Sequence, residues 1–240
     1  MFVVRAENLY KRFNEHWVVE NLNLSIREGE FYCLLGPNGA GKTTTLKLLV
    51  GLLKPTKGKI YIGGFSLDTM AEQAKKLVGF IPDTPFLYEN LTAIEFLEFI
   101  GTIFYIDKDT LKERINFYLD VFGLEEAKNI LLRDYSHGMR QRIIYIANLI
   151  HKPKVLLVDE PLVGLDPQGI NLIKRVLKEK TKEGMAIVMS THILQIAEQL
   201  ADRVGIMDRG KLIVEGSLEE LKKKIKEGSL EDIFFMLTQR

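Results

Sequence analysis

Cysteine is almost absent from this chain, because Cys33 is the only one among 240 residues. A single thiol excludes an internal disulfide and suits a reducing cytoplasm. Long apolar runs are also missing: the longest, residues 93–106, is interrupted by Glu95 and Glu98 and is too short to cross a bilayer. Because no signal peptide opens the sequence either, we expect the chain to be soluble by itself.

A net charge of one sign is missing as well. Lys and Arg number 33 against 32 Asp and Glu, a formal net charge of +1, so the sequence has no global basic field and we expect no nucleic-acid partner. Repeats, low-complexity tracts and flexible linkers are absent too. The chain is instead 46% hydrophobic, enough for one large domain or for one domain with an inserted lobe.

The hydrophobic pattern changes along the chain. The segments "FVVRAENLYKRF", "WVVENLNLSI" and "GKIYIGG" alternate apolar and polar residues and predict a small antiparallel sheet. The continuous apolar runs "FYCLLG", "KVLLVDE" and "MAIVMST" are typical of parallel strands covered on both faces. Residues 92–150 have helical periodicity instead, so the sequence predicts an α/β core with an antiparallel β subdomain and an inserted helical lobe.

Capping residues mark the expected helix ends. In the lobe, Thr92 with Glu95 forms a capping box, Gly123 can close the second helix and Ser136 can cap the last. Asp166 followed by a proline predicts another helix start. Ser217 with Glu220 and Ser229 with Asp232 predict two short helices within residues 217–240.

The most specific motif is "GPNGAGKTT", which lies between the strand "FYCLL" and the expected helix "TTTLKLLVGLL". Gly36, Gly41, Lys42 and Thr43 have the spacing of a P-loop. In such a loop the amides of residues 39–43 surround phosphates, the lysine reaches the β- and γ-phosphates, and the threonine hydroxyl holds Mg²⁺. The predicted nucleotide-binding residues of this loop are Gly36, Pro37, Asn38, Gly39, Ala40, Gly41, Lys42, Thr43 and Thr44.

A second motif, "KVLLVDEP", ends a buried strand in two carboxylates. Beside a P-loop, we expect Asp159 to bind Mg²⁺ through water and Glu160 to polarise the attacking water as general base. Taken alone, the pair reads equally well as an ordinary acidic strand end.

The order of the remaining motifs identifies a resemblance. "YSHGMRQR" precedes the "DE" strand, "VGLDP" follows it and "STH" ends the next strand. The chain resembles the nucleotide-binding subunit of ATP-binding-cassette (ABC) transporters over essentially its whole length, residues 1–240, with a helical subdomain at about 84–150. "YSHGM" looks like the family signature, usually Leu-Ser-Gly-Gly-Gln, which implies that Ser136 and Gly138 bind the γ-phosphate held by another cassette's P-loop.

The resemblance implies further roles. His192 matches the switch histidine that contacts the γ-phosphate and catalytic water, and residues 164–166 match a loop that crosses the dimer interface. Phe13 occupies the place of the aromatic residue that stacks on adenine. Tyr10 or Trp17 could substitute for it, and a core role for this phenylalanine is nearly as good a reading.

Two positions depart from the family pattern. His137 and Met139 replace a glycine and the glutamine of the signature, which predicts slower or asymmetric catalysis. Asp83 stands where the family usually has a glutamine that senses Mg²⁺ and the transmembrane subunit. A carboxylate can also bind hard cations, but its shorter side chain would reach the metal only if the loop moves. A simple turn residue is the alternative reading of Asp83.

The segment 85–105, "PFLYENLTAIEFLEFIGTIFY", is rich in large apolar residues. It reads equally well as the core of the lobe or as an exposed patch that binds a membrane subunit.

We therefore predict an ATPase that closes with a second cassette, identical or different, around two ATP and Mg²⁺. It would drive a separate transmembrane permease, and the resemblance favours export of the ABC-2 type. Such a subunit would be cytoplasmic and peripheral on the inner face of the cell membrane. The alternative is a soluble ABC ATPase that remodels a ribosome or DNA-repair complex. A P-loop kinase or GTPase is disfavoured, because the sequence has no Asn-Lys-x-Asp motif.

Overall fold

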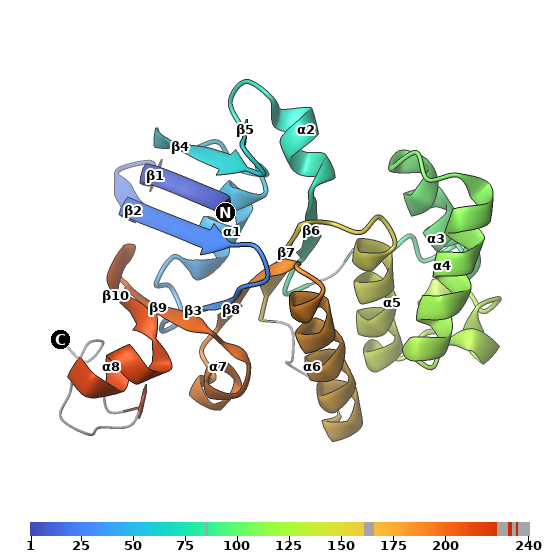
Figure 1. The fold of residues 1–240 in the computed structure, drawn as a ribbon. Helices are drawn as coiled ribbons and strands as arrows, with labels where there is room; N and C mark the ends of the chain where they lie inside the picture. Colours follow the sequence, from blue (N-terminus) through green and yellow to red (C-terminus); the bar gives the residue numbers. More distant parts are fainter. Residues whose placement is uncertain (85, 161–165, 225–229, 232–233, 235–240) are drawn as a thin grey trace.

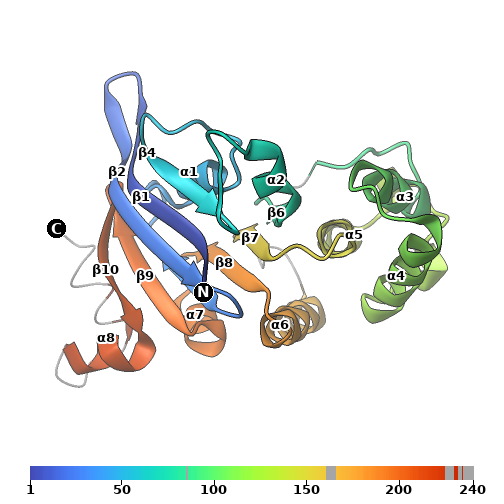
Figure 2. The same ribbon diagram turned by 45° about the horizontal axis from the view of Figure 1, so that its top comes forward.

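Two β-sheets and a separate group of helices make up the molecule (Figure 1). The computed structural model describes residues 1–84, 86–160, 166–224, 230–231 and 234. Within these residues the helices of the middle third extend to one side of the sheets, and a second view shows the same separation (Figure 2).

The smaller sheet is antiparallel, in the order β2-β1-β4-β5. It consists of β1 (Phe2–Phe13), β2 (His16–Arg27), β4 (Lys57–Ile62) and β5 (Phe65–Ser66). Residues such as Leu24 and Ile60 point into the core while their neighbours along the strands are partly or fully exposed, as the alternating pattern predicts. The three antiparallel segments expected from the sequence are thus confirmed.

The larger sheet has six strands, in the order β10-β9-β3-β8-β7-β6. These are β3 (Phe31–Leu35), β6 (Val78–Ile81), β7 (Val155–Asp159), β8 (Ala186–Thr191), β9 (Arg203–Asp208) and β10 (Lys211–Ser217). All neighbours are parallel except β9 and β10. The three continuous apolar runs form β3, β7 and β8, and every residue of these strands is buried.

The sequence pattern does not predict β5, β6, β9 or β10. β6 has only four residues, and one of them is Gly79, which has no side chain to contribute to a pattern. A Cβ at that position would lie 2.8 Å from Leu156 Cδ1, so a larger residue would force the Leu156 side chain to shift. β9 begins and ends in charged residues, Arg203 and Asp208, which shorten its apolar run.

Helices α1 (Lys42–Leu49), α2 (Ala71–Lys76), α6 (Pro167–Lys182), α7 (Leu194–Leu200) and α8 (Leu218–Lys224) accompany the strands. The expected extension of α1 to residue 53 is wrong, because Gly51 adopts a left-handed conformation (φ 73°) that the helix cannot continue through. Asp166 caps α6 by accepting a hydrogen bond from the Gly169 amide (2.7 Å), and Ser217 with Glu220 forms the predicted capping box. The expected start at Ser229 and Asp232 lies outside the described residues.

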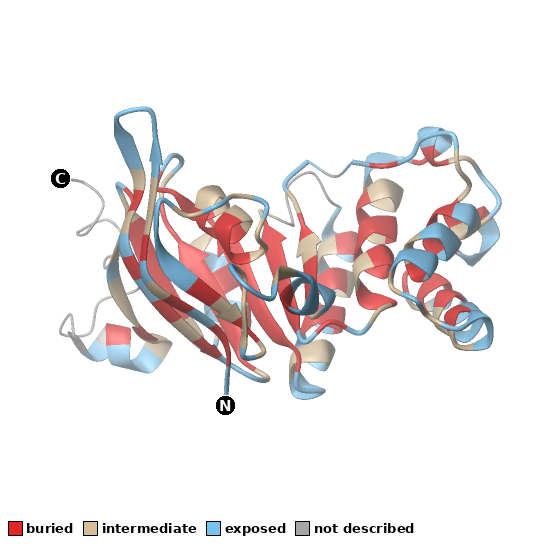
Figure 3. Ribbon diagram, turned by 90° about the horizontal axis from the view of Figure 1, so that it is seen from above, coloured by how far each residue is buried: buried red, intermediate tan, exposed pale blue. Residues whose placement is uncertain are grey.

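The lobe contains α3 (Ala93–Ile103), α4 (Lys108–Val121) and α5 (His137–Leu149), with short 3-10 turns at Glu125–Ala127 and Leu132–Asp134. The Thr92 capping box and the Ser136 cap are present, and Gly123 follows α4 with a φ of 63°. Asn148 on α5 accepts a hydrogen bond from the Phe80 amide of β6 (2.8 Å), which connects the lobe to the sheet. Figure 3 shows buried residues along both sheets and on α5.

Candidate functional site

The loop between β3 and α1 has a backbone that requires glycine at two places. A Cβ on Gly36 would lie 2.4 Å from the Met207 carbonyl oxygen. Gly41 has a φ of 103°, and a Cβ there would lie 2.5 Å from the Val18 carbonyl oxygen. Because Gly41 is the N-cap of α1 and offers no side chain, the amides of the first helical turn stay available to a bound anion.

This loop borders a cavity of about 270 Å³ at the carboxyl end of the parallel strands. Its lining combines the loop with one residue of β2 and with two further sequence motifs: Val18, Asn38, Gly39, Ala40, Gly41, Lys42, Thr43, Thr44, Asp83 and Glu160. The cavity thus brings together most of the predicted nucleotide-binding residues. Val18 was not among them, and no signal in its alternating strand marks it.

Lys42 is buried at the floor of this site. Its Nζ donates hydrogen bonds to the carbonyl oxygens of Gly36 (2.8 Å) and Pro37 (3.1 Å) and lies 3.6 Å from Glu160 Oε1. Desolvation lowers the pKa of Lys42, and the neighbouring carboxylates Glu160 and Asp159 oppose this shift. An ammonium group desolvated in this way is stabilised further by a bound phosphate.

Asp159, at the end of β7, is fully buried. Its Oδ1 accepts hydrogen bonds from the hydroxyls of Thr43 (3.1 Å) and Ser190, while its Oδ2 is buried without a partner. Burial raises the pKa of Asp159, and the two hydroxyl hydrogen bonds lower it.

The free Oδ2 and the Thr43 hydroxyl fit Mg²⁺. Both are hard oxygen donors, and Mg²⁺ is usually bound by one or two carboxylates together with substrate phosphates and water. Among the described residues there is no group of three or more His, Cys, Asp or Glu side chains that could hold a metal by themselves. This donor set would therefore hold the ion jointly with a nucleotide.

Glu160 follows directly with a left-handed backbone (φ 45°), which is unusual for a residue with a side chain. Its amide donates to the Ser190 carbonyl oxygen (3.2 Å), which holds this conformation in place. Its Oε2 lies 3.0 Å from His192 Nδ1. The predicted base and the predicted switch histidine are thus in contact beside the cavity.

Three predicted residues lie elsewhere. Ser136 and Gly138, at the start of α5, do not line the cavity, and Figures 1 and 2 both show α5 in the lobe and α1 beside the sheets. Phe13 does not line it either: its side chain is exposed, with Lys11 Nζ 4.9 Å from its ring centre. In the interface loop only Asp166 lies within the described residues; residues 164 and 165 fall outside them.

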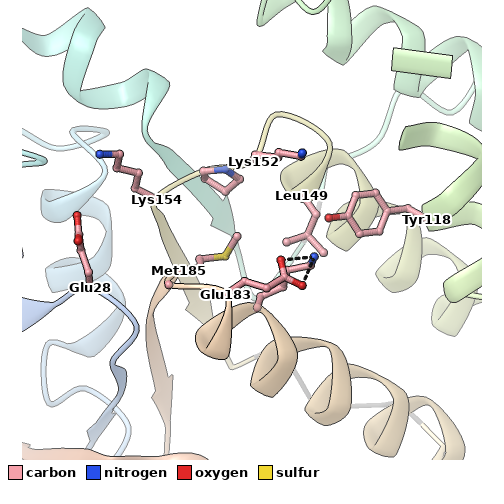
Figure 4. A pocket seen from close by; sticks show the side chains of 10 residues that line it. Glu28, Tyr118, Leu149, Lys152, Lys154, Glu183 and Met185 are labelled. Atoms are coloured by element: carbon pink, nitrogen blue, oxygen red, sulfur yellow. Dashed lines mark hydrogen bonds and ion pairs between the residues drawn. The ribbon is translucent and has the colours of Figure 1, made fainter. Parts of the chain in front are cut away.

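A larger cavity, of about 410 Å³, lies between the C-terminal end of α6 and the lobe (Figure 4). Lys180 and Glu183 form an ion pair there (2.8 Å), and the Lys180 ammonium lies 5.5 Å from the centre of the Tyr118 ring. No predicted site residue lines it, and the residues that do include no P-loop amide. The smaller cavity is thus the one with nucleotide chemistry.

Fold and cavity together define a P-loop nucleotide hydrolase, in which a glycine-rich loop, a buried lysine and a strand-end carboxylate pair share one site. Residues 19–163 match the ABC transporter family, and the chain belongs to this family. The resemblance inferred from the motifs is therefore confirmed.

Similar proteins agree with this assignment. The chain is 42% identical to the uncharacterized ABC transporter ATP-binding protein YxlF of Bacillus subtilis (strain 168), over 92% of this chain and 73% of that protein. It is 38% identical to the bacitracin transport ATP-binding protein BcrA of Enterococcus faecalis, over 93% of this chain and 72% of that protein.

Solved structures agree as well. An ATP-binding subunit of an ABC transporter superposes with a TM-score of 0.93 at 30% identity, covering 98% of this chain and 99% of that one. A dimeric ATP-binding cassette in a post-hydrolysis state, bound to ADP and Pi, superposes with a TM-score of 0.81 at 28% identity, covering 89% of this chain and 98% of that one.

The chain is thus an ATP-binding and ATP-hydrolysing subunit of the ABC transporter class, with the predicted fold. The comparisons give no support to a ribosome or DNA-repair ATPase. In the part of the chain that the structure describes, no helix is long and apolar enough to span a bilayer.

Proposed function

We propose that this chain powers an exporter: two cassettes close around two ATP and Mg²⁺ and drive a separate permease from the inner face of the membrane. The names of relatives support the direction, since they include the bacitracin transport protein BcrA, a linearmycin resistance ATP-binding protein (LnrL) and a Nod factor export ATP-binding protein. Residues 1–240 would act as one ATP-binding domain, with a helical subdomain at about 84–150.

The observation that carries the ATPase mechanism is the contact of Glu160 with both Lys42 and His192 at one cavity. The P-loop amides and Lys42 bind and orient the phosphates. Glu160 accepts the proton of the attacking water, and His192, through its Nδ1, holds the carboxylate in place. Thr43 and Asp159 would hold Mg²⁺, which neutralises developing charge on the phosphates when bound.

One half of the site is absent from a single chain. Ser136 and Gly138 do not reach the cavity, but they open a helix whose first amides can bind an anion. We assign them to the ATP held by the partner cassette. Phe13 remains the proposed adenine contact, and Asp83, exposed at the edge of the cavity, remains a proposed metal or coupling residue.

The permease would dock on the lobe. The segment from residue 86 to residue 105 divides: Phe96 and Leu97 are buried, whereas Phe86 is 78% exposed and Phe99 is 42% exposed. Residue 85 lies outside the described residues. The exposed Phe86 and Phe99 form the proposed docking patch. A cavity of about 540 Å³ at this patch is lined by residues 86–91 and Arg140. Exposed aromatic side chains beside a groove are typical of a surface that binds an apolar partner helix.

Arg140 connects this groove to the start of α5. Its guanidinium donates to Glu89 Oε1 (2.9 Å) in the groove and to the carbonyl oxygens of Arg133 (2.8 Å) and Tyr135 (3.2 Å). The ion pair is partly exposed, so its own contribution to stability is small. The position of Arg140 is the important feature. A permease helix bound in the groove would contact the same arginine that hydrogen-bonds the backbone next to Ser136.

The substitution Glu160→Gln tests the proposed mechanism. The amide cannot accept the water proton, so hydrolysis should fall by roughly 10² or more while ATP binding persists. Unhydrolysed ATP should then hold two subunits together, which size-exclusion chromatography with and without ATP would detect. An ATPase rate near that of the wild type would contradict the role of Glu160.

A further inference from the structure

Ser190 is a buried polar residue at the carboxyl end of β8, in a strand that is otherwise apolar up to this point. In the parallel pairing of β7 with β8, it lies opposite Asp159. Its hydroxyl donates a hydrogen bond to Asp159 Oδ1, and its carbonyl oxygen accepts one from the Glu160 amide. One residue therefore contacts both members of the carboxylate pair.

The two Asp159 oxygens consequently differ. Oδ1 accepts from Thr43 and Ser190, whereas Oδ2 has no partner and is buried. Thr43 belongs to the P-loop, and its hydroxyl is also a proposed metal ligand, so its bond to Asp159 depends on what the loop binds. Ser190 belongs to the sheet. Its hydrogen bond restrains the rotation of the carboxylate from a buried strand rather than from the nucleotide-binding loop.

Ser190 also fixes the residue that follows. Glu160 has a left-handed backbone, and its amide lies 3.2 Å from the Ser190 carbonyl oxygen and 3.4 Å from the Ser190 hydroxyl oxygen. These contacts orient the Glu160 side chain towards Lys42 and His192. Burying a hydroxyl costs free energy unless it is hydrogen-bonded, and here both partners are site residues.

We propose that Ser190 is a positioning residue for Mg²⁺·ATP: by holding Asp159 Oδ1, it keeps Oδ2 open and aimed for the metal. The inference rests on the proposed role of Asp159 as a metal-binding residue. It predicts that the Ser190 hydroxyl contributes to the affinity for ATP with Mg²⁺ and contributes little to the affinity for ATP alone.

The test measures the dissociation constant of a fluorescent, non-hydrolysable ATP analogue twice, in Mg²⁺ and in EDTA. The quantity compared is the ratio of the Kd in EDTA to the Kd in Mg²⁺. In Ser190→Ala this ratio should fall about tenfold, the effect of losing one hydrogen bond to a charged group. The Kd in EDTA should stay within about twofold of wild type. Ser190→Thr, which keeps the hydroxyl, should retain the wild-type ratio.

Three further variants make the result specific. Thr191→Val removes the next buried hydroxyl, which accepts from the Ile193 amide (3.1 Å), and should leave the ratio unchanged. Ser190→Cys keeps the shape of the side chain, slightly enlarged, with a weaker donor and serves if Ser190→Ala does not fold. Asp159→Asn should abolish the Mg²⁺ dependence.

The outcomes separate the two proposals. A wild-type ratio in both Ser190→Ala and Ser190→Cys, with the ratio lost in Asp159→Asn, overturns the role of Ser190 and leaves the proposed function intact. Equal losses of affinity in Mg²⁺ and in EDTA would show a merely structural role and overturn it too. A wild-type ratio in Asp159→Asn overturns the metal-binding role itself, and the inference with it.

Discussion

Two helix openings in this protein differ in how completely they are built. At the start of α1, Gly41 leaves the first turn uncapped, and Lys42 and Asp159 are already buried around the place for a phosphate. At the start of α5, the Ser136 side chain is exposed and caps its own helix by accepting from the Met139 amide (3.3 Å). The first opening is a binding site in one chain, whereas the second has amides for an anion but, in the part of the chain that the structure describes, does not line the nucleotide cavity.

The difference in burial decides which of the two openings can bind a phosphate in a single chain and which needs a second molecule. The desolvated ammonium of Lys42 and the uncapped amides at α1 make phosphate binding favourable before any partner arrives. An exposed turn such as that of α5 binds an anion weakly by itself, because water competes for its amides. It becomes effective only where a second molecule excludes that water. Substitutions at the two openings should therefore have different consequences.

Lys42→Ala should have the largest effect. It removes a charge-assisted contact that strengthens as the γ-phosphate leaves, so ATPase turnover should fall by roughly 10² to 10³ and the affinity for ATP should fall as well. Steady-state ATPase rates and binding of a fluorescent ATP analogue would measure both. Full ATP affinity in this variant would remove the distinction drawn between the two openings.

Gly138→Asp should reduce turnover by about 10² through repulsion between its carboxylate and the partner's γ-phosphate. The affinity of the isolated subunit for ATP should not change, because α5 does not line the nucleotide cavity. Loss of ATP binding by the monomer would place this turn at the chain's own nucleotide and contradict the comparison.

Much of this site is readable from the sequence, because a P-loop depends on local chemistry. The glycine spacing, the strand before it and the helix after it are adjacent in the chain, and the backbone explains why Gly36 and Gly41 cannot be replaced. The caps at Thr92, Ser136 and Asp166 were equally predictable, since each cap is a contact between residues three apart.

What the sequence could not provide is long-range pairing. Ser190 was quoted in the motif "STH" without a role, and only the alignment of β8 with β7 places it opposite Asp159. Strand β6 is not apparent from the sequence for the same reason. Its four residues, one of them a glycine, are too few to show a periodic pattern, and only the pairing with β7 defines the strand. The end of α1 is not apparent from the sequence, because Gly51 lies within an apolar run of helical pattern.

Asp83→Ala should have a smaller effect on the isolated subunit. Asp83 lies at the edge of the cavity, exposed, with Oδ1 accepting from the Thr84 amide (2.8 Å). We expect basal ATPase to fall only several-fold, but stimulation by the permease to be lost, because the residue precedes the proposed docking patch. ATPase assays with and without reconstituted permease would measure this. Complete loss of basal turnover would instead make Asp83 a direct ligand of metal or water.

Ser136→Ala should have the smallest effect on the folded monomer. Loss of the cap should lower the free energy of unfolding by about 1 kcal/mol, which thermal denaturation would detect, and Ser136→Asn should restore most of it. Association with ATP in a Glu160→Gln background should weaken in both variants, because neither keeps the serine hydroxyl for the partner's phosphate. Normal association in Ser136→Ala would limit this residue to helix capping.

The central claim is that the two openings act on one ATP from different chains, and mixing Lys42→Ala with Gly138→Asp subunits tests it most directly. In a heterodimer, the intact P-loop of the Gly138→Asp chain would face the intact α5 opening of the Lys42→Ala chain, which restores one site of two. Each variant alone should hydrolyse ATP at no more than roughly a hundredth of the wild-type rate. The mixture should regain part of the wild-type ATPase activity, and with Glu160→Gln in both chains it should form an ATP-dependent heterodimer. If wild-type protein shows both properties and the mixture shows neither, the two openings do not share a nucleotide and the account is wrong.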